Sequence, residues 1–301
     1  MKFSIWPSFE RPWSELLRFV TTAESDGWFG CWYADHLMPN TDDGATADGV
    51  AFECWSVLAA LAASTSTMRL GSLVSPVTFH HPVVLAKRAT TVDHISRGRA
   101  VLGLGAGWQV NEHIAIGVEL PPPGERVTRF EQAIEIVSRV RTEERVTTDG
   151  SFYRATDLPF DPKPVGLQLM VGSSGARMMG ITAKWADEWN VWGTPDTVGQ
   201  HTSTFLAACE RVGRDPASMH RSTQALVFLV DDPDRAAKMA ERVPADRSLV
   251  GSPAQLVEQI GRYAELGVDE FILPDFTLGG SAEQRFDTFH RFHAEVASQL
   301  A

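Results

Sequence analysis

The stretch GRAVLGLGAGWQVNEH, residues 98–113, contains three alternate glycines that discriminate between two kinds of fold. The fingerprint of a dinucleotide-binding turn has glycines at offsets zero, two and five, whereas Gly103, Gly105 and Gly107 stand at offsets zero, two and four. The helix expected after the stretch would also meet three consecutive prolines, residues 121–123, before another strand could form. Both observations argue against a nicotinamide-binding Rossmann domain.

The same glycines lie at the end of an expected strand, and the absence of side chains there has two explanations. A bare strand end leaves a ledge against which a flat ring or its ribityl chain could lie. Close packing of the strand end inside a barrel would require glycine equally well. The sequence leaves both explanations open.

On both sides of this stretch, short apolar strands alternate with helices along the chain. The segments expected to be buried strands are residues 2–6, 28–34, 69–77, 99–105, 166–172, 188–192, 223–230 and 269–275. The segments expected to be helices are residues 13–26, 52–63, 82–96 and one in which Val127, Phe130, Ile134 and Val137 recur at helical spacing. Eight β/α units predict an α/β protein, a (β/α)8 TIM barrel with insertion segments, and a doubly wound open sheet is the alternative.

The domain organisation follows from the absence of linker-like segments. The polar residues 143–164 are expected to form a small hairpin or loop inserted into the barrel. No stretch rich in Pro, Gly or Ser divides the chain, so residues 1–301 are expected to form a single domain.

The composition restricts the classes of partner. The longest apolar run, residues 57–63, is too short to span a bilayer, and the N-terminal residues lack the apolar core of a signal peptide. Cys31, Cys54 and Cys209 have neither metal-ligand nor redox spacing, which suits a reducing cytoplasm. A net charge of −11 provides no general attraction for nucleic acid or anionic membranes. We therefore expect a cytoplasmic protein with a small-molecule substrate, and a homodimer stays open as its assembly.

Two polar residues follow the second expected strand, in WYADHLM, residues 32–38. Active sites of barrels lie at the carboxyl ends of the strands, so Asp35 and His36 are expected at the barrel mouth. A histidine there can exchange protons near neutral pH, and a neighbouring carboxylate can order the loop or a ligand. The alternative is a polar start of a loop without a catalytic role.

The segment VGSSGARMMG, residues 171–180, ends a strand and begins a helix. Backbone N–H groups at the helix N-terminus, together with the hydroxyls of Ser173 and Ser174, could bind a phosphate, and Arg177 could add charge. Ordinary helix capping is the alternative. In the similar turn VGSPAQL, residues 250–256, capping by Ser252 is sufficient.

No metal site is expected. His80 and His81 are adjacent, and side chains one residue apart diverge in an extended chain. The tryptophans near expected strand ends could line an apolar pocket, although barrel packing could also account for them; these are Trp6, Trp55, Trp108 and Trp192.

Four segments, in order, resemble the bacterial luciferase-like flavin and deazaflavin oxidoreductases. The longest runs from PVVLAKRATTVDHISRGR through GLGAGW to ERVTRFEQAIEIV, residues 82–137, and includes Glu112. The others are YADHLM, GSSGARMMGITAKWADEWN and VGSPAQLVEQIGRYAELGVDEFIL. The DH after the second strand and the GAGW after the fourth look more like the members that use coenzyme F420 than those that use FMN.

This resemblance implies a (β/α)8 barrel that holds F420 at its mouth and transfers a hydride between the deazaflavin and a small organic substrate. His36 would be the catalytic residue at the reactive face. The residues implied in cofactor binding are Asp35, then Ser72, Leu73 and Val74 with a non-proline cis peptide under the ring, Gly105, Ala106 and Gly107 beside the ring, and Ser173, Ser174, Gly175 and Ala176 at the phosphate. FMN in place of F420 would imply a two-component flavin monooxygenase, and a non-catalytic F420-binding protein is a third hypothesis.

Two positions depart from relatives of this kind. The sugar-phosphate dehydrogenase branch has an acid where this chain has Trp108, so the resemblance implies an apolar or aromatic substrate in a pocket lined by Trp6, Trp108 and Trp192. Glu188 stands where family members often have glycine, and the sequence leaves its role open.

Overall fold

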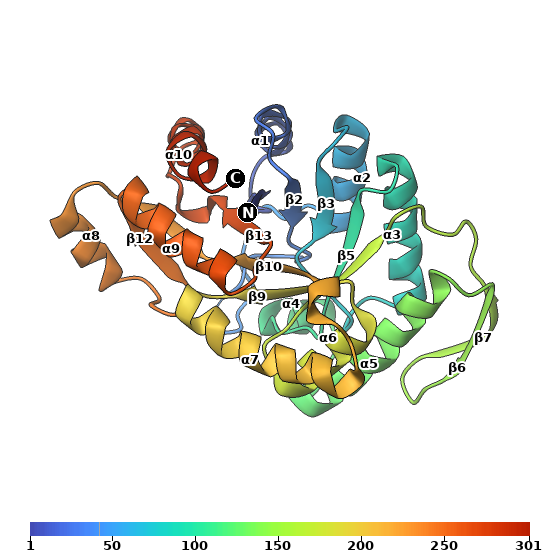
Figure 1. Ribbon diagram of the computed structural model, residues 1–301. Coiled ribbons are helices and arrows are strands. Elements are labelled where there is room, and N and C mark those ends of the chain that lie inside the picture. The colour runs from blue at the N-terminus through green and yellow to red at the C-terminus, as the bar shows by residue number, and fades with distance from the viewer. Residues whose placement is uncertain (42) are drawn as a thin grey trace.

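The computed structural model describes residues 1–41 and 43–301, in which eight parallel strands close into a barrel (Figure 1). The barrel strands are β1 (Lys2–Trp6), β2 (Gly30–Tyr33), β3 (Arg69–Ser72), β5 (Ala100–Gly105), β8 (Gln168–Gly172), β9 (Glu188–Trp192), β10 (His220–Gln224) and β13 (Glu270–Pro274). Each pairs with the next, and β13 returns to β1 with Glu270 opposite Lys2. The predicted (β/α)8 barrel is confirmed, and the closure excludes the doubly wound open sheet.

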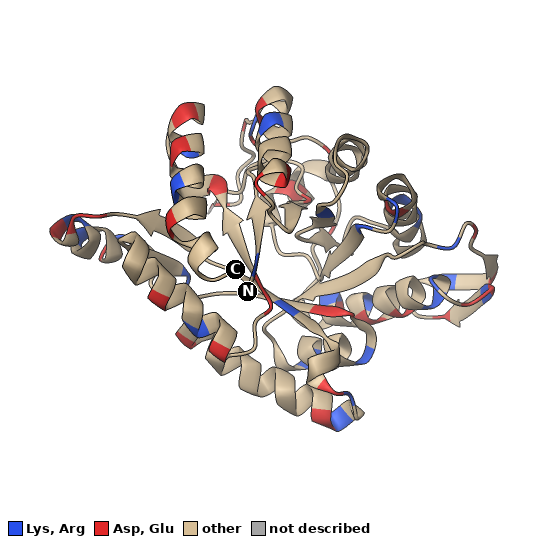
Figure 2. Cartoon of the chain, turned by 45° about the horizontal axis from the view of Figure 1, so that its top comes forward, with Lys and Arg blue, Asp and Glu red and all other residues tan. Residues whose placement is uncertain are grey.

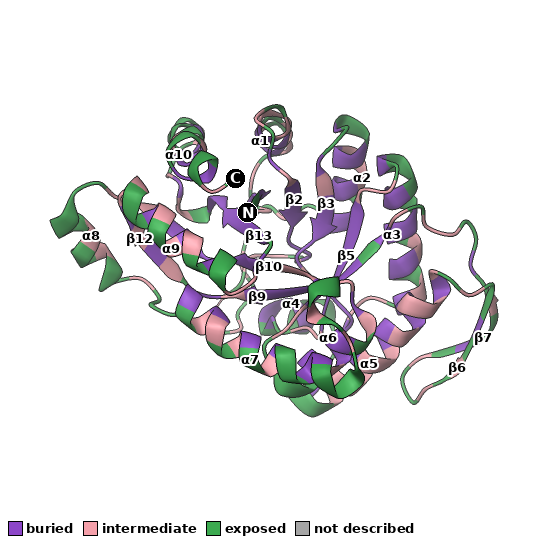
Figure 3. Ribbon diagram, viewed as in Figure 1, coloured by how far each residue is buried: buried purple, intermediate pink, exposed green. Residues whose placement is uncertain are grey.

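Eight helices cover the outside of the barrel: α1 (Trp13–Ser25), α2 (Cys54–Ser64), α3 (Pro82–Ser96), α5 (Pro123–Val140), α6 (Ala176–Trp185), α7 (Pro195–Val212), α9 (Pro253–Glu265) and α10 (Ala282–Glu295). Figure 3 shows that their buried residues face the strands and their exposed residues face outward. On α5 the buried face includes Phe130, Ile134 and Val137, as the helical spacing predicts. Trp189 of β9 stacks on Phe205 of α7 with ring centroids 4.4 Å apart, a contact that adds about 1 kcal/mol to the burial of both rings.

Insertions extend from the barrel on two sides (Figure 1). The predicted hairpin is confirmed as β6 (Arg145–Asp149) paired antiparallel with β7 (Arg154–Pro159). A short strand β4 (Ser75–Pro76) pairs with the end of β5, and a short helix α4 (Val110–Ile116) follows β5. On the other side, α8 (Pro233–Ala240) lies between β11 (Leu226–Leu229) and β12 (Ser248–Gly251).

Two predicted strands are wrong in their extent. Residues 69–77 form two short strands, β3 and β4, instead of one. Residues 223–230 do not form a single barrel strand, because the barrel strand β10 ends at Gln224 and the following β11 pairs with β12 outside the barrel. Residues on both sides of this boundary are apolar, because both strands are paired in sheets. The second strand, Leu226–Leu229, pairs with Ser248–Gly251. An apolar pattern shows that a segment is a strand but not which strand it pairs with.

Alternate residues of each strand point into the barrel. These inward-pointing residues form an apolar part and a polar part. The apolar part is a cluster of seven buried residues, Trp6, Trp32, Ala34, Leu73, Val101, Met170 and Ile272. On β9 and β10 the buried polar residues Asn190 and Ser222 take inward positions instead. The barrel interior therefore holds polar side chains at β9 and β10 beside the apolar cluster.

The outer surface carries charges of both signs interspersed along the helices (Figure 2). All three cysteines are buried and unpaired. Among the helices of the described residues, none is long and apolar enough to cross a membrane.

Candidate functional site

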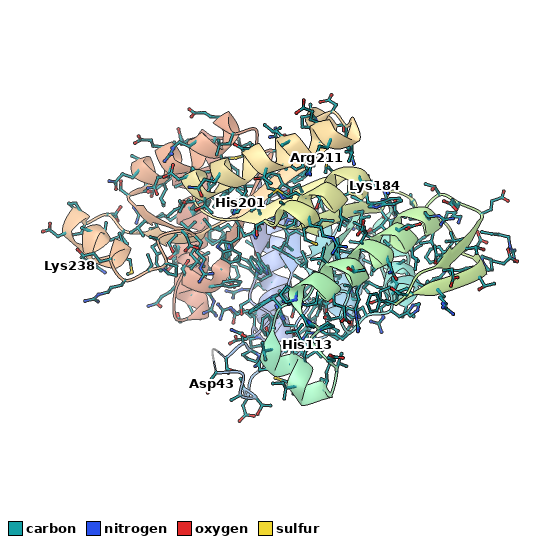
Figure 4. All side chains as sticks on the ribbon, turned by 90° about the horizontal axis from the view of Figure 1, so that it is seen from below. Asp43, His113, Lys184, His201, Arg211 and Lys238 are labelled. Atoms are coloured by element: carbon teal, nitrogen blue, oxygen red, sulfur yellow. The ribbon has the colours of Figure 1, made fainter. Side chains whose placement is uncertain are left out.

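The carboxyl ends of the barrel strands border a cavity of about 840 Å³, next to a smaller one of about 270 Å³. Both cavities are lined by His36, Val74, Trp108, Gly172, Ser173 and Ser174, so they are adjoining parts of one cleft. The loop after β2, which carries Asp43, and helix α4, which carries His113, project from one end of the molecule (Figure 4). This end is the mouth at which the sequence places the site.

His36 lies where the two cavities meet and is held by an acid from α4. Its Nδ1 is 3.1 Å from Glu112 Oε1, and Glu112 Oε2 accepts a hydrogen bond from the backbone N–H of Leu37 at 2.9 Å. The Glu112 side chain is only 1% exposed, and the rings of Phe9 and Trp108 lie 5.9 and 5.6 Å from the imidazole. Because the carboxylate engages Nδ1, Nε2 is the nitrogen that can exchange a proton with a ligand.

Asp35 does not line either cavity. Its Oδ2 lies 2.9 Å from His80 Nε2, and its side chain is almost fully buried, so it joins the loop after β2 to the loop after β4. His81 turns elsewhere and contacts Tyr153 edge to face at 5.8 Å. The two adjacent histidines therefore diverge as the sequence predicts.

The glycines of the opening stretch make room for neighbouring protein segments. A Cβ at Gly103 would lie 1.9 Å from the carbonyl oxygen of Ser72, and one at Gly105 would lie 2.5 Å from Val74 Cγ2. Gly107 has a φ of +85° and would place a Cβ 2.5 Å from the Thr78 hydroxyl. Close packing thus accounts for all three glycines, while the backbone of Gly105, Ala106 and Gly107 still lines the smaller cavity.

The segment after β3 brings one hydrophobic side chain to the junction of the cavities. Val74 lines both cavities and lies between Gly105 and Gly172, and Leu73 lines the larger one. The peptide bond between Leu73 and Val74 is cis, as the resemblance implies. Ser72 lies behind this segment, fully buried, and its hydroxyl donates to the carbonyl of Gly103 at 2.9 Å.

The N-terminus of α6 borders the smaller cavity through Ser173, Ser174 and Gly175. The N-cap residue is Gly175, which has no side chain to cap the first-turn N–H groups, and α6 itself begins at Ala176. A Cβ at Gly175 would meet nothing within 4 Å. The N-terminus therefore offers uncapped donors and open space to an anion.

Two groups predicted to assist this N-terminus have other partners. The Ser173 hydroxyl lies 3.2 Å from the Thr182 hydroxyl, whose own hydrogen is donated to a backbone carbonyl. Arg177 turns toward α5, where it pairs with Glu131 at 2.9 Å and contacts Thr128. Ser252, by contrast, is the N-cap residue of α9 as predicted, and its backbone N–H donates to Gln255 Oε1 at 2.9 Å.

Aromatic side chains line the larger cavity. Trp6 meets Trp192 and Phe276 edge to face, with ring centroids 5.2 and 5.0 Å apart. Trp108 is 58% exposed and its ring is nearly perpendicular to that of His36. Trp55 is absent from this lining, because it is buried and its indole N–H donates to Ser75 at 3.1 Å.

Sequence reasoning missed several residues of the cleft. Glu112 of α4 is one of them, because its contact with His36 joins segments 76 residues apart along the chain. Asn190 and Gln224 line the floor of the larger cavity, and the alternation of inward positions on β9, two residues before Trp192, could have pointed to Asn190. His201 of α7 and Arg247 before β12 also line this cavity, and no local signal in the sequence places them there.

Comparison with known proteins identifies the family and agrees with the fold. A family model described as luciferase-like monooxygenase matches residues 1–246. The F420-dependent glucose-6-phosphate dehydrogenase of Kineococcus radiotolerans is 28% identical over 95% of this chain and 93% of the relative. The F420-dependent hydroxymycolic acid dehydrogenase of Mycobacterium tuberculosis is 26% identical over 88% of this chain and 72% of the relative. An F420-dependent secondary alcohol dehydrogenase, solved in complex with an F420-acetone adduct, shares the fold with a TM-score of 0.83 at 16% identity, over 100% of this chain and 99% of that one.

Proposed function

The chain belongs to the luciferase-like monooxygenase family, and we propose that it is an F420-dependent oxidoreductase that transfers a hydride between the deazaflavin and a small apolar or aromatic substrate. The observation that carries this proposal is the His36–Glu112 pair at the junction of two adjoining cavities. The curated relatives described above are named for F420-dependent reactions, which favours F420 over FMN.

The residues present fit a phosphate-bearing ring cofactor. The uncapped N-terminus of α6 carries a partial positive charge that favours an anion, and Gly175 leaves space for it. Val74 and the backbone of residues 105–107 would border the ring, while Ser174 and Gly175 would bind the phosphate. Asp35 and Ser72 would not touch the cofactor. They would act indirectly, by holding the loops that carry His36 and Val74.

A bound deazaflavin would supply the carbon that gives or receives the hydride. His36 Nε2 would exchange a proton with the substrate as the hydride moves. Glu112 would keep the imidazole in one orientation, because its buried carboxylate lies 3.1 Å from Nδ1. The rings of Phe9 and Trp108, 5.9 and 5.6 Å from the imidazole, would reduce the access of water to it.

The proposed substrate class rests on the walls of the larger cavity. Trp6, Trp192 and Phe276 form an edge-to-face aromatic cluster suited to an apolar or aromatic body. Trp108 takes the place of the acid that the sugar-phosphate branch would use, which argues against a sugar phosphate as substrate.

Titration with oxidised F420 and, separately, with FMN tests the cofactor assignment, with ligand fluorescence as the measurement. We expect F420 to bind and FMN to bind more weakly. The variant Gly175→Asp should weaken F420 binding at least tenfold, because it adds a carboxylate at the anion site without a steric clash. Gly124→Asp is the matched control, since a Cβ at Gly124 on the first turn of α5 also meets nothing within 4 Å.

Binding of FMN alone would replace the proposal with a two-component flavin monooxygenase. Binding of neither compound would refute it. F420 binding without any hydride transfer in a screen of alcohols, aldehydes and ketones would indicate an F420-binding protein that is not an enzyme.

A further inference from the structure

Four buried polar side chains form a hydrogen-bonded column inside the barrel. Glu188 and Asn190 come from β9, and Ser222 and Gln224 come from β10. None of the four is more than 4% exposed. Glu188 is the first residue of β9, at the end of the barrel opposite the mouth, whereas Asn190 and Gln224 line the larger cavity. The column therefore connects the closed end of the barrel to the floor of the cavity.

At the closed end, Glu188 can only accept hydrogen bonds. Arg69 donates to Glu188 Oε2 at 2.6 Å and also to Glu270 at 2.8 Å, so Glu188 is the carboxylate partner in a buried ion pair. Ser222 lies 2.7 Å from Glu188 Oε1. A carboxylate has no hydrogen to give, so Ser222 donates its one hydroxyl hydrogen to Glu188.

This donation sets the direction of every bond above it. Ser222 Oγ can then only accept, and Asn190 Nδ2 donates to it at 2.9 Å. The second hydrogen of the Asn190 amide goes to Gln224 Oε1 at 2.8 Å, and Gln224 Nε2 donates back to Asn190 Oδ1 at 3.2 Å. Turning both amides over would keep the hydrogen bonds between Asn190 and Gln224. It would, however, place Asn190 Oδ1 next to Ser222 Oγ, whose hydrogen is already donated to Glu188, so two acceptor oxygens would face each other.

A count of hydrogens identifies the group left for a ligand. Ser222, Asn190 and Gln224 carry five hydrogens on their polar atoms, and four of them are used in the column. The fifth is on Nε2 of Gln224, a residue that lines the larger cavity. Each amide oxygen already accepts one bond, and a buried N–H without a partner is rarer in proteins than an oxygen with one lone pair unused.

We propose that Gln224 is a specificity-determining residue whose free N–H binds an acceptor oxygen of the substrate, and that Glu188 is the positioning residue that fixes this polarity from the far end of the barrel. The inference rests on the proposed function in taking this cavity as the substrate site. It narrows the substrate class to molecules with an apolar or aromatic body and a carbonyl, ether or hydroxyl oxygen. The body would pack against Trp6 and Trp192.

The test compares two probes of nearly the same shape, acetophenone, which has an acceptor oxygen, and α-methylstyrene, which has a methylene group in its place. Their dissociation constants are measured by calorimetry or ligand-observed NMR on the purified protein without cofactor. We expect acetophenone to bind about tenfold more tightly. In Gln224→Met this preference should vanish while α-methylstyrene binds as before. The control Thr223→Val changes the adjacent residue, which bonds to the carbonyl of Val191 rather than to the column, and should retain the preference.

Glu188→Gln provides a second test. Its expected result is a reversed ligand preference, which a general loss of structure would not produce. A glutamine can donate to Ser222, which frees the serine hydrogen for Asn190 and allows both amides to turn over, so that Gln224 presents its oxygen to the cavity. We expect this variant to lose the preference for acetophenone and to gain one for indole, an N–H donor, over indene, its analogue without the N–H.

Each remaining outcome counts against the inference. Equal binding of acetophenone and α-methylstyrene to the wild-type protein, or a preference that survives in Gln224→Met, would overturn it. So would the failure of both probes to bind at about 10 mM, a concentration at which weak ligands of apolar cavities are detectable. Failure of F420 to bind in the separate titration would overturn the proposed function alone, because the probe measurements do not involve the cofactor.

Discussion

Glu270, at the closed end of the barrel, should make the stability of this protein depend on pH in a specific window. It is fully buried and accepts hydrogen bonds from Trp32 and Arg69 at 2.8 Å, with His220 Nε2 also 2.8 Å away. Burial by itself would raise the pKa of Glu270, but Arg69 and His220 outweigh burial and lower the pKa from 4.5 to about 2. A carboxyl group whose pKa falls this far on folding contributes on the order of 3 kcal/mol to the free energy of unfolding.

The sign follows from the direction of the shift. Because the pKa is lower in the folded state, the contribution is complete above the unfolded value of 4.5 and is lost as the pH falls from about 5 to about 2. Glu270→Gln is uncharged at every pH. Its free energy of unfolding should lie about 3 kcal/mol below that of the wild-type protein near pH 6, and the gap should narrow steadily toward pH 2.

Urea unfolding followed by tryptophan fluorescence measures this gap, since the chain has nine tryptophans. Glu258→Gln is the control, because Glu258 is an exposed carboxylate on α9, and it should change stability by less than about 0.5 kcal/mol. Parallel pH profiles for the wild-type protein and Glu270→Gln would refute the reasoning, since they would mean that Glu270 titrates alike in the folded and unfolded states.

Three further predictions concern the cleft. His36→Ala should lower F420-linked turnover by at least about 100-fold with the best substrate from the screen, while F420 affinity by fluorescence stays within about tenfold; unchanged turnover would remove His36 from the mechanism. Glu112→Gln keeps the size of the side chain but removes its charge, and should lower kcat about tenfold to 100-fold with little change in F420 affinity; an equal loss of both would mean that Glu112 only maintains the loop. Gly107→Leu should unfold at a lower temperature than the wild-type protein, because its Cβ would meet Thr78 and its φ is positive; an unchanged Tm by circular dichroism would contradict the close packing found here.

Local patterns predicted much of the barrel because they depend on neighbours along the chain. The spacing of Val127, Phe130, Ile134 and Val137 is a property of one helix face, and that face is buried in α5. The N-cap position of Ser252 is likewise a local feature. The strand at residues 223–230 was wrong because its two halves pair with different partners, which only the assembled sheets determine.

The candidate site divides in the same way. The position of Asp35, His36 and the 173–176 turn after barrel strands follows from the order of strands and helices, since all parallel strands of a barrel end at the same mouth. The roles of their side chains did not follow. Asp35 is paired with His80, and Arg177 is drawn to α5, through contacts between residues more than 40 positions apart.

The sequence by itself determined the alternation of strands and helices, the barrel that eight such units form, and the absence of a dinucleotide fingerprint among Gly103, Gly105 and Gly107. Only the tertiary structure decided why those glycines are needed, because the nearest atom that each Cβ would meet belongs to the segment of residues 72–78. The tertiary structure also showed the surroundings of Glu188, which lies at the closed-barrel end of a hydrogen-bonded column that reaches the cavity. Hydrogen bonds and steric contacts between distant segments depend on the closed barrel, and no pattern along the chain encodes their direction.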